Sequence, residues 1–188
     1  LVSEVNSKTN DRVEAFFSEA RKQEQVFSNL VTTTNFMSQE GSLLRLLWEF
    51  VQVLPDAESM SIADEHGNYL QARLYPEPAT RTIHRSIASP VETINFRDKQ
   101  YGVLRTEVKP DPDFDPRTRP WYRSVGSQPY MQWTAPYLAN TTKRPVVSGS
   151  YPILVNGARA GVVNVNLPLA SLSAFMAEQK ISPHGVAF

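Results

Sequence analysis

The chain has 188 residues, which is enough for one domain with a substantial hydrophobic core. Lysine plus arginine and aspartate plus glutamate each total 19, so the formal net charge is zero and no overall field favours nucleic acid or an anionic membrane. The absence of cysteine excludes disulfides, thiolate catalysis and cysteine-ligated metals. The longest apolar stretches are far shorter than the roughly 20 residues that cross a bilayer.

Two helices are predicted in the first part of the chain. Between residues 11 and 31, apolar side chains recur every three to four residues with charged side chains between them, which predicts an amphipathic helix. A second helix is predicted over 43–54, because Leu43, Leu47 and Phe50 share one face and Pro55 ends the pattern. The first helix is expected to extend from the globule as a stalk.

After the second helix, apolar residues alternate with polar ones, which is typical of strands. The runs 59–64 and 69–75 flank a turn-forming segment and predict a β-hairpin. In the second run, Tyr69, Gln71 and Arg73 alternate with apolar residues. We therefore expect this hairpin to have one face exposed to water.

Further strands and a short helix are predicted in the middle of the chain. Weaker alternating runs predict strands over 82–88, 91–97 and 102–108. Asp115 is placed as a helix N-cap and Pro116 as the first helical residue, where the missing N–H costs nothing. This short helix is expected to carry Trp121 and Tyr122.

The clearest local signal is a hairpin near the end of the chain. Asn156 and Gly157 tolerate the positive φ angles of a tight turn and separate two β-rich runs, 146–155 and 158–167. A closing helix is predicted over 168–179. Together the elements predict an α+β fold, with a long N-terminal helix and an antiparallel sheet of about five strands flanked by helices.

The sequence lacks the motifs of common catalytic and metal sites. Its three histidines are scattered, without the spacing of paired metal ligands. Asp111, Asp113 and Asp115 suggest a calcium loop, but Pro116 and Tyr122 occupy the places where an EF-hand needs glycine and glutamate. We therefore predict no catalytic residues, no metal site and no cofactor.

Aromatic and arginine residues are concentrated between residues 117 and 138. One interpretation is a core plug in which Trp121, Trp133 and Tyr137 fill space over the sheet. The other is a ligand pocket, because indole, phenol and guanidinium donors are interleaved with the rings and a concave site needs both apolar walls and a few polar groups. In a pocket, Arg119 would be the anchor, since its planar fork matches a carboxylate.

Several sequence segments, taken in a fixed order, resemble those of a known family. They are FDPRTRPWYRSV, WTAPYL, KRPVVSGSYPI, NGARAGVVNVNLPLASLS and a late GVAF. In this order they resemble the Cache superfamily, specifically the membrane-distal lobe of double Cache (dCache_1) sensor domains, and the resemblance covers residues 1–188. It implies an extracytoplasmic, PAS-like ligand-binding module of a bacterial chemoreceptor, sensor histidine kinase or nucleotide cyclase.

The resemblance also implies a ligand site. Family members that bind amino acids hold the ligand carboxylate with an Arg-x-Trp-Tyr motif and a later tyrosine, and the ammonium with an aspartate. Two positions depart from that pattern: Phe114 replaces a tyrosine and Asn166 replaces the aspartate. A neutral amide offers a hydrogen bond without charge, so the sequence favours a small organic acid, with an amino acid as the alternative. The predicted ligand-binding residues are Phe114, Arg119, Trp121, Tyr122, Trp133, Tyr137, Asn164 and Asn166.

The resemblance divides the chain into three segments. Residues 1–55 would form the stalk helix and the second helix, residues 56–180 the ligand-binding lobe, and residues 181–188 a linker or the start of a second lobe. The whole chain is then expected to be a non-enzymatic sensor domain in the periplasmic part of an inner-membrane receptor, with a small-molecule ligand and a homodimer in the full receptor. A structural or dimerisation domain without a small ligand is the remaining alternative.

Overall fold

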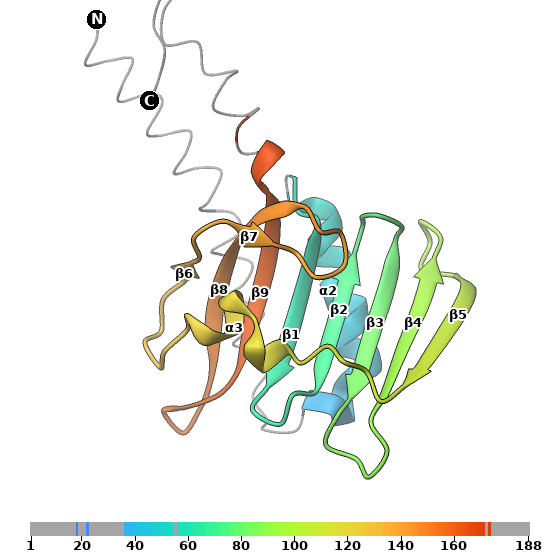
Figure 1. The fold of residues 1–188 in the computed structure, drawn as a ribbon, viewed down its shortest axis with the longest axis horizontal. Coiled ribbons are helices and arrows are strands. Elements are labelled where there is room, and N and C mark those ends of the chain that lie inside the picture. The colour runs from blue at the N-terminus through green and yellow to red at the C-terminus, as the bar shows by residue number, and fades with distance from the viewer. Residues whose placement is uncertain (1–17, 19–21, 23–35, 55, 172, 174–188) are drawn as a thin grey trace, which may run out of the picture.

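Within the residues that the computed structural model describes, which are 18, 22, 36–54, 56–171 and 173, the fold is built around a nine-stranded antiparallel sheet (Figure 1). The strands follow the order β5-β4-β3-β2-β1-β9-β8-β6, and β7 also pairs with β8. The elements in chain order are η1 (Phe36–Gln39), α2 (Glu40–Val53), β1 (Ser59–Asp64), β2 (Tyr69–Arg73), β3 (Ala79–His84), β4 (Val91–Arg97), β5 (Val103–Pro110), η2 (Pro116–Thr118), α3 (Pro120–Arg123), β6 (Gln132–Trp133), β7 (Tyr137–Leu138), β8 (Pro145–Val155) and β9 (Ala158–Pro168).

The predicted α+β architecture is confirmed. The sheet has nine strands rather than about five, and each of the seven strand segments predicted along the chain has a counterpart in it. The additional strands β6 and β7 have two residues each, which is too short to give an alternating pattern. Strand β3 begins and ends earlier than predicted. It ends at His84 because the Asn68 side chain accepts hydrogen bonds from the backbone N–H groups of Arg85 and Ser86, which takes them out of the strand ladder.

The predicted helices are described to different extents. Helix α2 starts three residues before the predicted 43–54 segment, at Glu40, and ends at Val53. The helix predicted over 11–31 lies outside the described residues apart from Ser18 and Lys22, which are both helical. Of the closing helix predicted over 168–179, residues 169–171 and 173 are helical and the rest lies outside the described residues. The short helix is confirmed, as η2, which Asp115 caps, followed directly by α3.

Helix α2 covers one face of the sheet, behind it in Figure 1. The apolar side chains along one face of α2 pack against apolar side chains of the central strands, and the two sets together form a core. This α2-side core includes Leu43, Leu47, Trp48, Val51, Met60, Ile62, Leu70, Val163 and Val165, all of them at most 2% exposed. Because side chains alternate along a strand, the residues between these project from the opposite face.

The opposite face of the central strands is polar yet buried. Ser59 and Ser61 of β1, Ser148 and Ser150 of β8 and Asn164 of β9 are each at most 2% exposed. The segment that contains η2 and α3 lies over this face, in front of the sheet in Figure 1. A row of hydrogen-bonding side chains is thereby enclosed between sheet and covering segment.

The β8–β9 hairpin brings the last strand to the centre of the sheet. Asn156 and Gly157 have φ angles of 52° and 79°, which the Asn-Gly sequence tolerates, and the predicted turn is confirmed. Strand β9 then pairs with β1 on its other side, with Ser59 opposite Asn166. The hairpin therefore aligns the polar residues of β8, β9 and β1 in one row.

Candidate functional site

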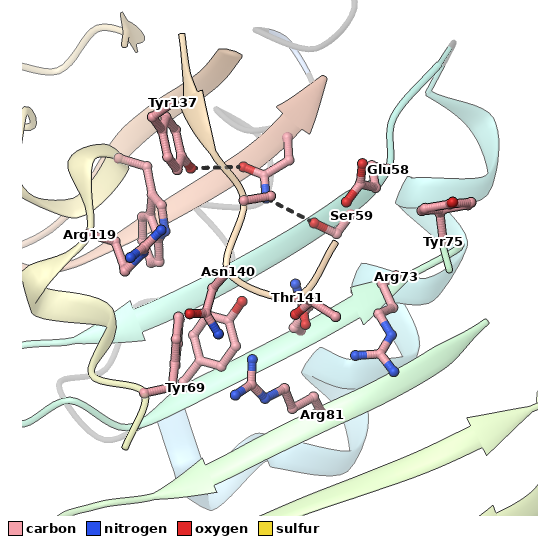
Figure 2. A pocket seen from close by; sticks show the side chains of 15 residues that line it. Glu58, Ser59, Tyr69, Arg73, Tyr75, Arg81, Arg119, Tyr137, Asn140 and Thr141 are labelled. Carbon is pink, nitrogen blue, oxygen red and sulfur yellow. Dashed lines mark hydrogen bonds between the residues drawn. The ribbon is translucent and has the colours of Figure 1, made fainter. Parts of the chain in front are cut away.

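A pocket lies over the polar face of the sheet, between β1, β2, β3 and the segments that cover them (Figure 2). Five of the eight predicted site residues line it: Phe114, Arg119, Trp121, Tyr137 and Asn166. They come from three separate parts of the chain. The fold therefore brings together residues that the sequence related only through a family pattern.

Arg119 occupies the junction between η2 and α3, where the backbone is extended. Its side chain is half-buried, and Nη2 donates a hydrogen bond of 3.0 Å to the Leu138 carbonyl. Its guanidinium carbon lies 5.8 Å from the centroid of the Tyr137 ring. Within the described part of the chain Arg119 forms no ion pair with a carboxylate, so its charge can bind an anionic group.

A hydrogen-bond network fixes the part of the wall that includes Tyr137 and Asn166. The Tyr137 hydroxyl lies 2.7 Å from Ser148 Oγ, and Ser148 Oγ donates to Asn166 Oδ1 at 2.6 Å. Asn166 Nδ2 donates to Ser59 Oγ at 3.2 Å, so both ends of the amide are bonded. Burial raises the pKa of Tyr137 to about 12, which keeps its phenol protonated as a hydrogen-bond donor.

Asn164 shares the face of Asn166, as predicted, but is not among the residues that line the pocket. It is fully buried, its Nδ2 donates to Asn166 Oδ1 at 3.0 Å, and its Oδ1 accepts from Ser150 Oγ at 3.0 Å. These bonds hold the Asn166 amide in one orientation. Asn164 thus supports the wall and does not line the pocket.

The structure does not bring Tyr122 and Trp133 into the pocket. Tyr122 packs in the small apolar cluster under α3, with the Arg159 guanidinium 4.8 Å from its ring. Trp133 packs against the α2-side core on the other face of the sheet. It fits there because Gly149 has no side chain, and a Cβ at that position would lie 2.7 Å from the indole ring.

Sequence reasoning missed the part of the pocket that strands β2 and β3 provide. Tyr69, Gln71 and Arg73 were expected on a face exposed to water, and that expectation is wrong because the segment after β5 covers them: each is at most 5% exposed. All three line the pocket, together with Arg81 of β3. The alternating pattern showed that these three residues share a face. It could not show that residues 40 or more positions away in the chain cover that face.

Arg81 and Glu58 contribute charge to the pocket. Arg81 forms a buried ion pair with Glu92, and its guanidinium lies 4.5 Å from the Phe114 ring centroid. Burial raises the pKa of Glu58, against the opposing effects of a Thr142 hydrogen bond and the Arg144 guanidinium. Glu58 Oε2 is buried and has no hydrogen-bond donor among the residues that the structure describes. The pocket therefore offers an unpartnered acceptor as well as cationic groups.

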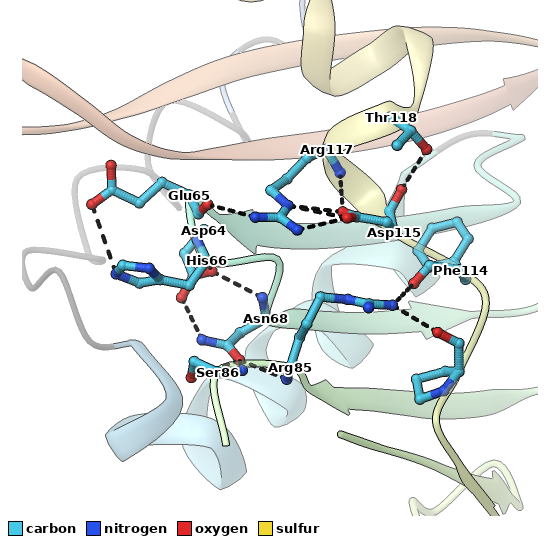
Figure 3. A network of polar contacts seen from close by, with 11 residues as sticks. Asp64, Glu65, His66, Asn68, Arg85, Ser86, Phe114, Asp115, Arg117 and Thr118 are labelled. Atoms are coloured by element: carbon cyan, nitrogen blue, oxygen red, sulfur yellow. Dashed lines mark hydrogen bonds and ion pairs between the residues drawn. The ribbon is translucent and has the colours of Figure 1, made fainter. Parts of the chain in front are cut away.

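A polar network anchors the covering segment to the loops at the end of the sheet (Figure 3). Arg85 Nη2 donates to the carbonyls of Pro112 and Phe114 at 2.8 and 2.7 Å. Arg117 pairs with Asp115 at 2.7 Å and donates to the Glu65 carbonyl at 3.3 Å. These contacts fix the backbone of the stretch from Phe114 to Arg119. They thereby position the Phe114 ring and the Arg119 guanidinium.

The pocket is nearly closed. Its free volume is about 20 Å³, room for about one water molecule. The turn between β7 and β8 covers it, where the Ala139 N–H donates to the Arg144 carbonyl and the Lys143 N–H donates to the Ala139 carbonyl. Asn140 and Thr141 of this turn line the pocket. A ligand larger than water therefore requires outward movement of this turn or of the aromatic walls.

The described residues contain no group of three histidine, cysteine or acidic side chains that could hold a metal ion. His84 lies instead against Glu40, with Nε2 2.9 Å from a carboxylate oxygen. In the same part of the chain no helix has both the length and the apolar character to cross a bilayer.

Comparison with known proteins places the chain in a family. Residues 63–174 match the family model of the methyl-accepting chemotaxis protein-like, first PDC sensor domain. No curated protein sequence matches the chain. Similar solved structures include the sensory domain of the Campylobacter jejuni chemoreceptor Tlp3 with isoleucine bound (18% identity, TM-score 0.61, covering 92% of this chain and 60% of that one). Another is the ligand-binding domain of the Pseudomonas fluorescens chemoreceptor CtaA with L-alanine (17% identity, TM-score 0.64, covering 93% and 61%).

At these identities the solved structures establish the shared fold, and this chain spans about three fifths of their length. The family match and the fold confirm the resemblance to Cache-type sensor domains. They also agree with the assignment of a sensor function rather than an enzymatic one. Because the matched segment covers more than half of the chain, this chain belongs to the family of methyl-accepting chemotaxis protein-like PDC sensor domains.

Proposed function

We propose that this domain is the extracytoplasmic, periplasmic part of a bacterial inner-membrane receptor and that it senses a small molecule with a carboxylate group. The observation that carries the proposal is the Arg119 guanidinium at the edge of an enclosed polar pocket. Within the described part of the chain, it donates a hydrogen bond to the Leu138 carbonyl and forms no ion pair with a carboxylate. A carboxylate would take both N–H groups of the planar fork and exclude water from them. The neutral Asn166 amide, which lines the same pocket, is consistent with a ligand that has no obligatory amine.

Ligand binding can alter signalling only if the ligand binds two conformations unequally. The small free volume of the pocket supports such a coupling, since the covering turn must move when a ligand enters. We propose that this movement passes to the helices predicted before residue 36 and after residue 168, and that a homodimer of the full receptor carries it onward. The division into segments 1–55, 56–180 and 181–188 remains a prediction.

An amino acid is the second candidate ligand. The Tlp3 and CtaA structures contain isoleucine and L-alanine, and their fold is shared with this chain. Glu58 Oε2 favours this candidate: it is a buried acceptor for which the described residues offer no donor, and it could bind an ammonium group. In that case Glu58→Gln should weaken binding of amino acids more than binding of the matching acids without an amine.

The experiment is a thermal-shift screen against organic acids, amino acids, amines and purines. A ligand at a hundred times its Kd adds about 2.7 kcal/mol of apparent stability, which is a shift of several degrees. Arg119→Ala should abolish the shift, whereas Arg123→Ala, on the exposed side of α3, should preserve it. Shifts from amines or purines alone would contradict the carboxylate site, and the absence of any shift would favour a structural domain without a ligand.

A further inference from the structure

Gln71 is a buried polar residue in the middle of β2. It is 5% exposed and lines the pocket, and the residues that the structure describes offer no hydrogen-bond donor to its Oε1. Buried polar atoms in folded proteins almost always have a partner. A buried acceptor beside a pocket and without a donor therefore points to a group that the pocket binds.

The strand register shows where the neighbours of Gln71 are directed. Gln71 stands directly opposite Ser61 of β1 and Arg81 of β3. Ser61 Oγ accepts a hydrogen bond of 3.5 Å from Asn164 Nδ2. Arg81 forms the buried ion pair with Glu92. Both cross-strand neighbours thus bond to other residues, and the pocket is the place from which a donor can reach Gln71 Oε1.

The charges around the pocket favour a neutral donor at this oxygen. The carboxylates there already interact with arginines. Glu92 pairs with Arg81, and the guanidiniums of Arg144 and Arg73 stabilise the ionised form of Glu58. An ammonium group would compete with these arginines for the same carboxylates. A hydroxyl or an amide N–H needs only the amide oxygen as its partner.

Gln71 lies on a different side of the pocket from Arg119. Arg119 stands at the start of α3, whereas Gln71 belongs to β2 and faces β3. Figure 2 shows Arg73 and Arg81 apart from Arg119, with Asn140 between them. A carboxylate bound by Arg119 therefore leaves the Gln71 side of the pocket to the other end of the ligand.

We propose that the ligand carries, at the end remote from its carboxylate, a neutral hydrogen-bond donor that Gln71 Oε1 accepts. This inference rests on the proposed carboxylate-sensing function and narrows the ligand class to small acids with a remote hydroxyl or amide N–H group. Gln71 then determines specificity. An acid with a methyl group in that place displaces water from the oxygen without replacing its hydrogen bond, which lowers the affinity.

The test is calorimetric titration of this chain with acids of equal size that differ only in the terminal group. One set is pentanoate, 4-hydroxybutyrate and 4-aminobutyrate, which end in a methyl, a hydroxyl and an ammonium group. The second set is one carbon shorter: butyrate, 3-hydroxypropionate and 3-aminopropionate. In at least one set, the hydroxy acid should bind about fivefold or more tightly than the other two acids.

Gln71→Leu removes the acceptor and should reduce the preference for the hydroxyl over the methyl group to less than about twofold. The control Gln52→Leu makes the same change at an exposed position of α2 and should preserve the preference. Gln71→Met is the second apolar variant if Gln71→Leu does not fold.

Equal binding of the hydroxy acid and the methyl acid in both sets, with binding still lost in Arg119→Ala, would overturn the inference and leave the proposed function intact. A preference for the hydroxyl that survives Gln71→Leu would also overturn it. Tightest binding of the amino acid in each set would overturn it in favour of an ammonium-binding site. Failure of every carboxylate to bind would remove the proposed function, and this inference with it.

Discussion

Asn166→Asp tests whether the neutral wall of the pocket selects against amines. Asn166 Oδ1 accepts hydrogen bonds from Ser148 Oγ at 2.6 Å and from Asn164 Nδ2 at 3.0 Å, and a carboxylate oxygen could accept both. Its Nδ2 donates to Ser59 Oγ at 3.2 Å, and the serine hydroxyl can rotate to become the donor instead. The surrounding network therefore accommodates an aspartate without losing a hydrogen bond.

The expected effect is a gain in affinity for ligands that carry an ammonium group. A hydrogen bond to a neutral acceptor contributes about 1 kcal/mol and one to a charged acceptor about 1.5–3 kcal/mol. The difference, about 0.5–2 kcal/mol, corresponds to a change of roughly two- to thirtyfold in Kd. Calorimetric titration with L-alanine and propionate measures it, because these ligands differ only in the amine. The ratio of their Kd values should shift toward L-alanine by that factor in Asn166→Asp.

The control is Asn156→Asp in the exposed β8–β9 turn, which adds the same charge away from the pocket. This variant should leave the ratio unchanged. If Asn166→Asp folds with a similar Tm and the ratio stays at its wild-type value, the ligand does not place its α-substituent against Asn166. The assignment of this wall would then be wrong.

Two further predictions concern stability. Glu92→Ala should lower the free energy of unfolding by about 3–5 kcal/mol because it leaves Arg81 buried and unpaired. The control Glu107→Ala removes an exposed partner of Arg105 and should lower it by less than about 1 kcal/mol. If urea unfolding shows the same loss of stability for both variants, the buried ion pair is contradicted. Burial raises the pKa of Tyr137 from 10.0 to about 12, so its contribution to stability is complete below pH 10 and is lost as the pH rises toward 12, by about 2–3 kcal/mol. Tyr137→Phe should remove that part of the loss of stability at alkaline pH. Identical profiles of stability against pH for the wild-type chain and the variant would contradict this prediction.

The sequence predicted those elements whose pattern is long or whose turn chemistry is specific. The hairpin of β8 and β9 was located to within one residue because Asn156-Gly157 fixes the turn, and Asp115 marked the start of η2. Strands β6 and β7 were not predicted, since two residues cannot show a period. Their pairing depends on β8, which follows them in the chain.

Only those pocket residues that belong to a local sequence motif were predicted correctly. The motif around Arg119 and Trp121 led to one wall of the pocket: Phe114, Arg119 and Trp121 line it, whereas Tyr122 of the same motif does not. Arg73 was expected to face water because its alternation is that of a half-exposed strand, and only the tertiary cover of residues 111–141 reverses this. Trp133 was grouped with the pocket by its position in the aromatic stretch, yet the alternation along β6 and β8 puts it on the α2 side.

The most direct test of the carboxylate-binding pocket is a crystal structure of this chain with the acid that gives the largest thermal shift. We expect a ligand carboxylate to accept from both guanidinium N–H groups of Arg119, near Tyr137 and Asn166, and the bond from Arg119 to the Leu138 carbonyl to be broken or shared. A ligand bound elsewhere, with the Arg119–Leu138 bond intact and the pocket still closed, would contradict it.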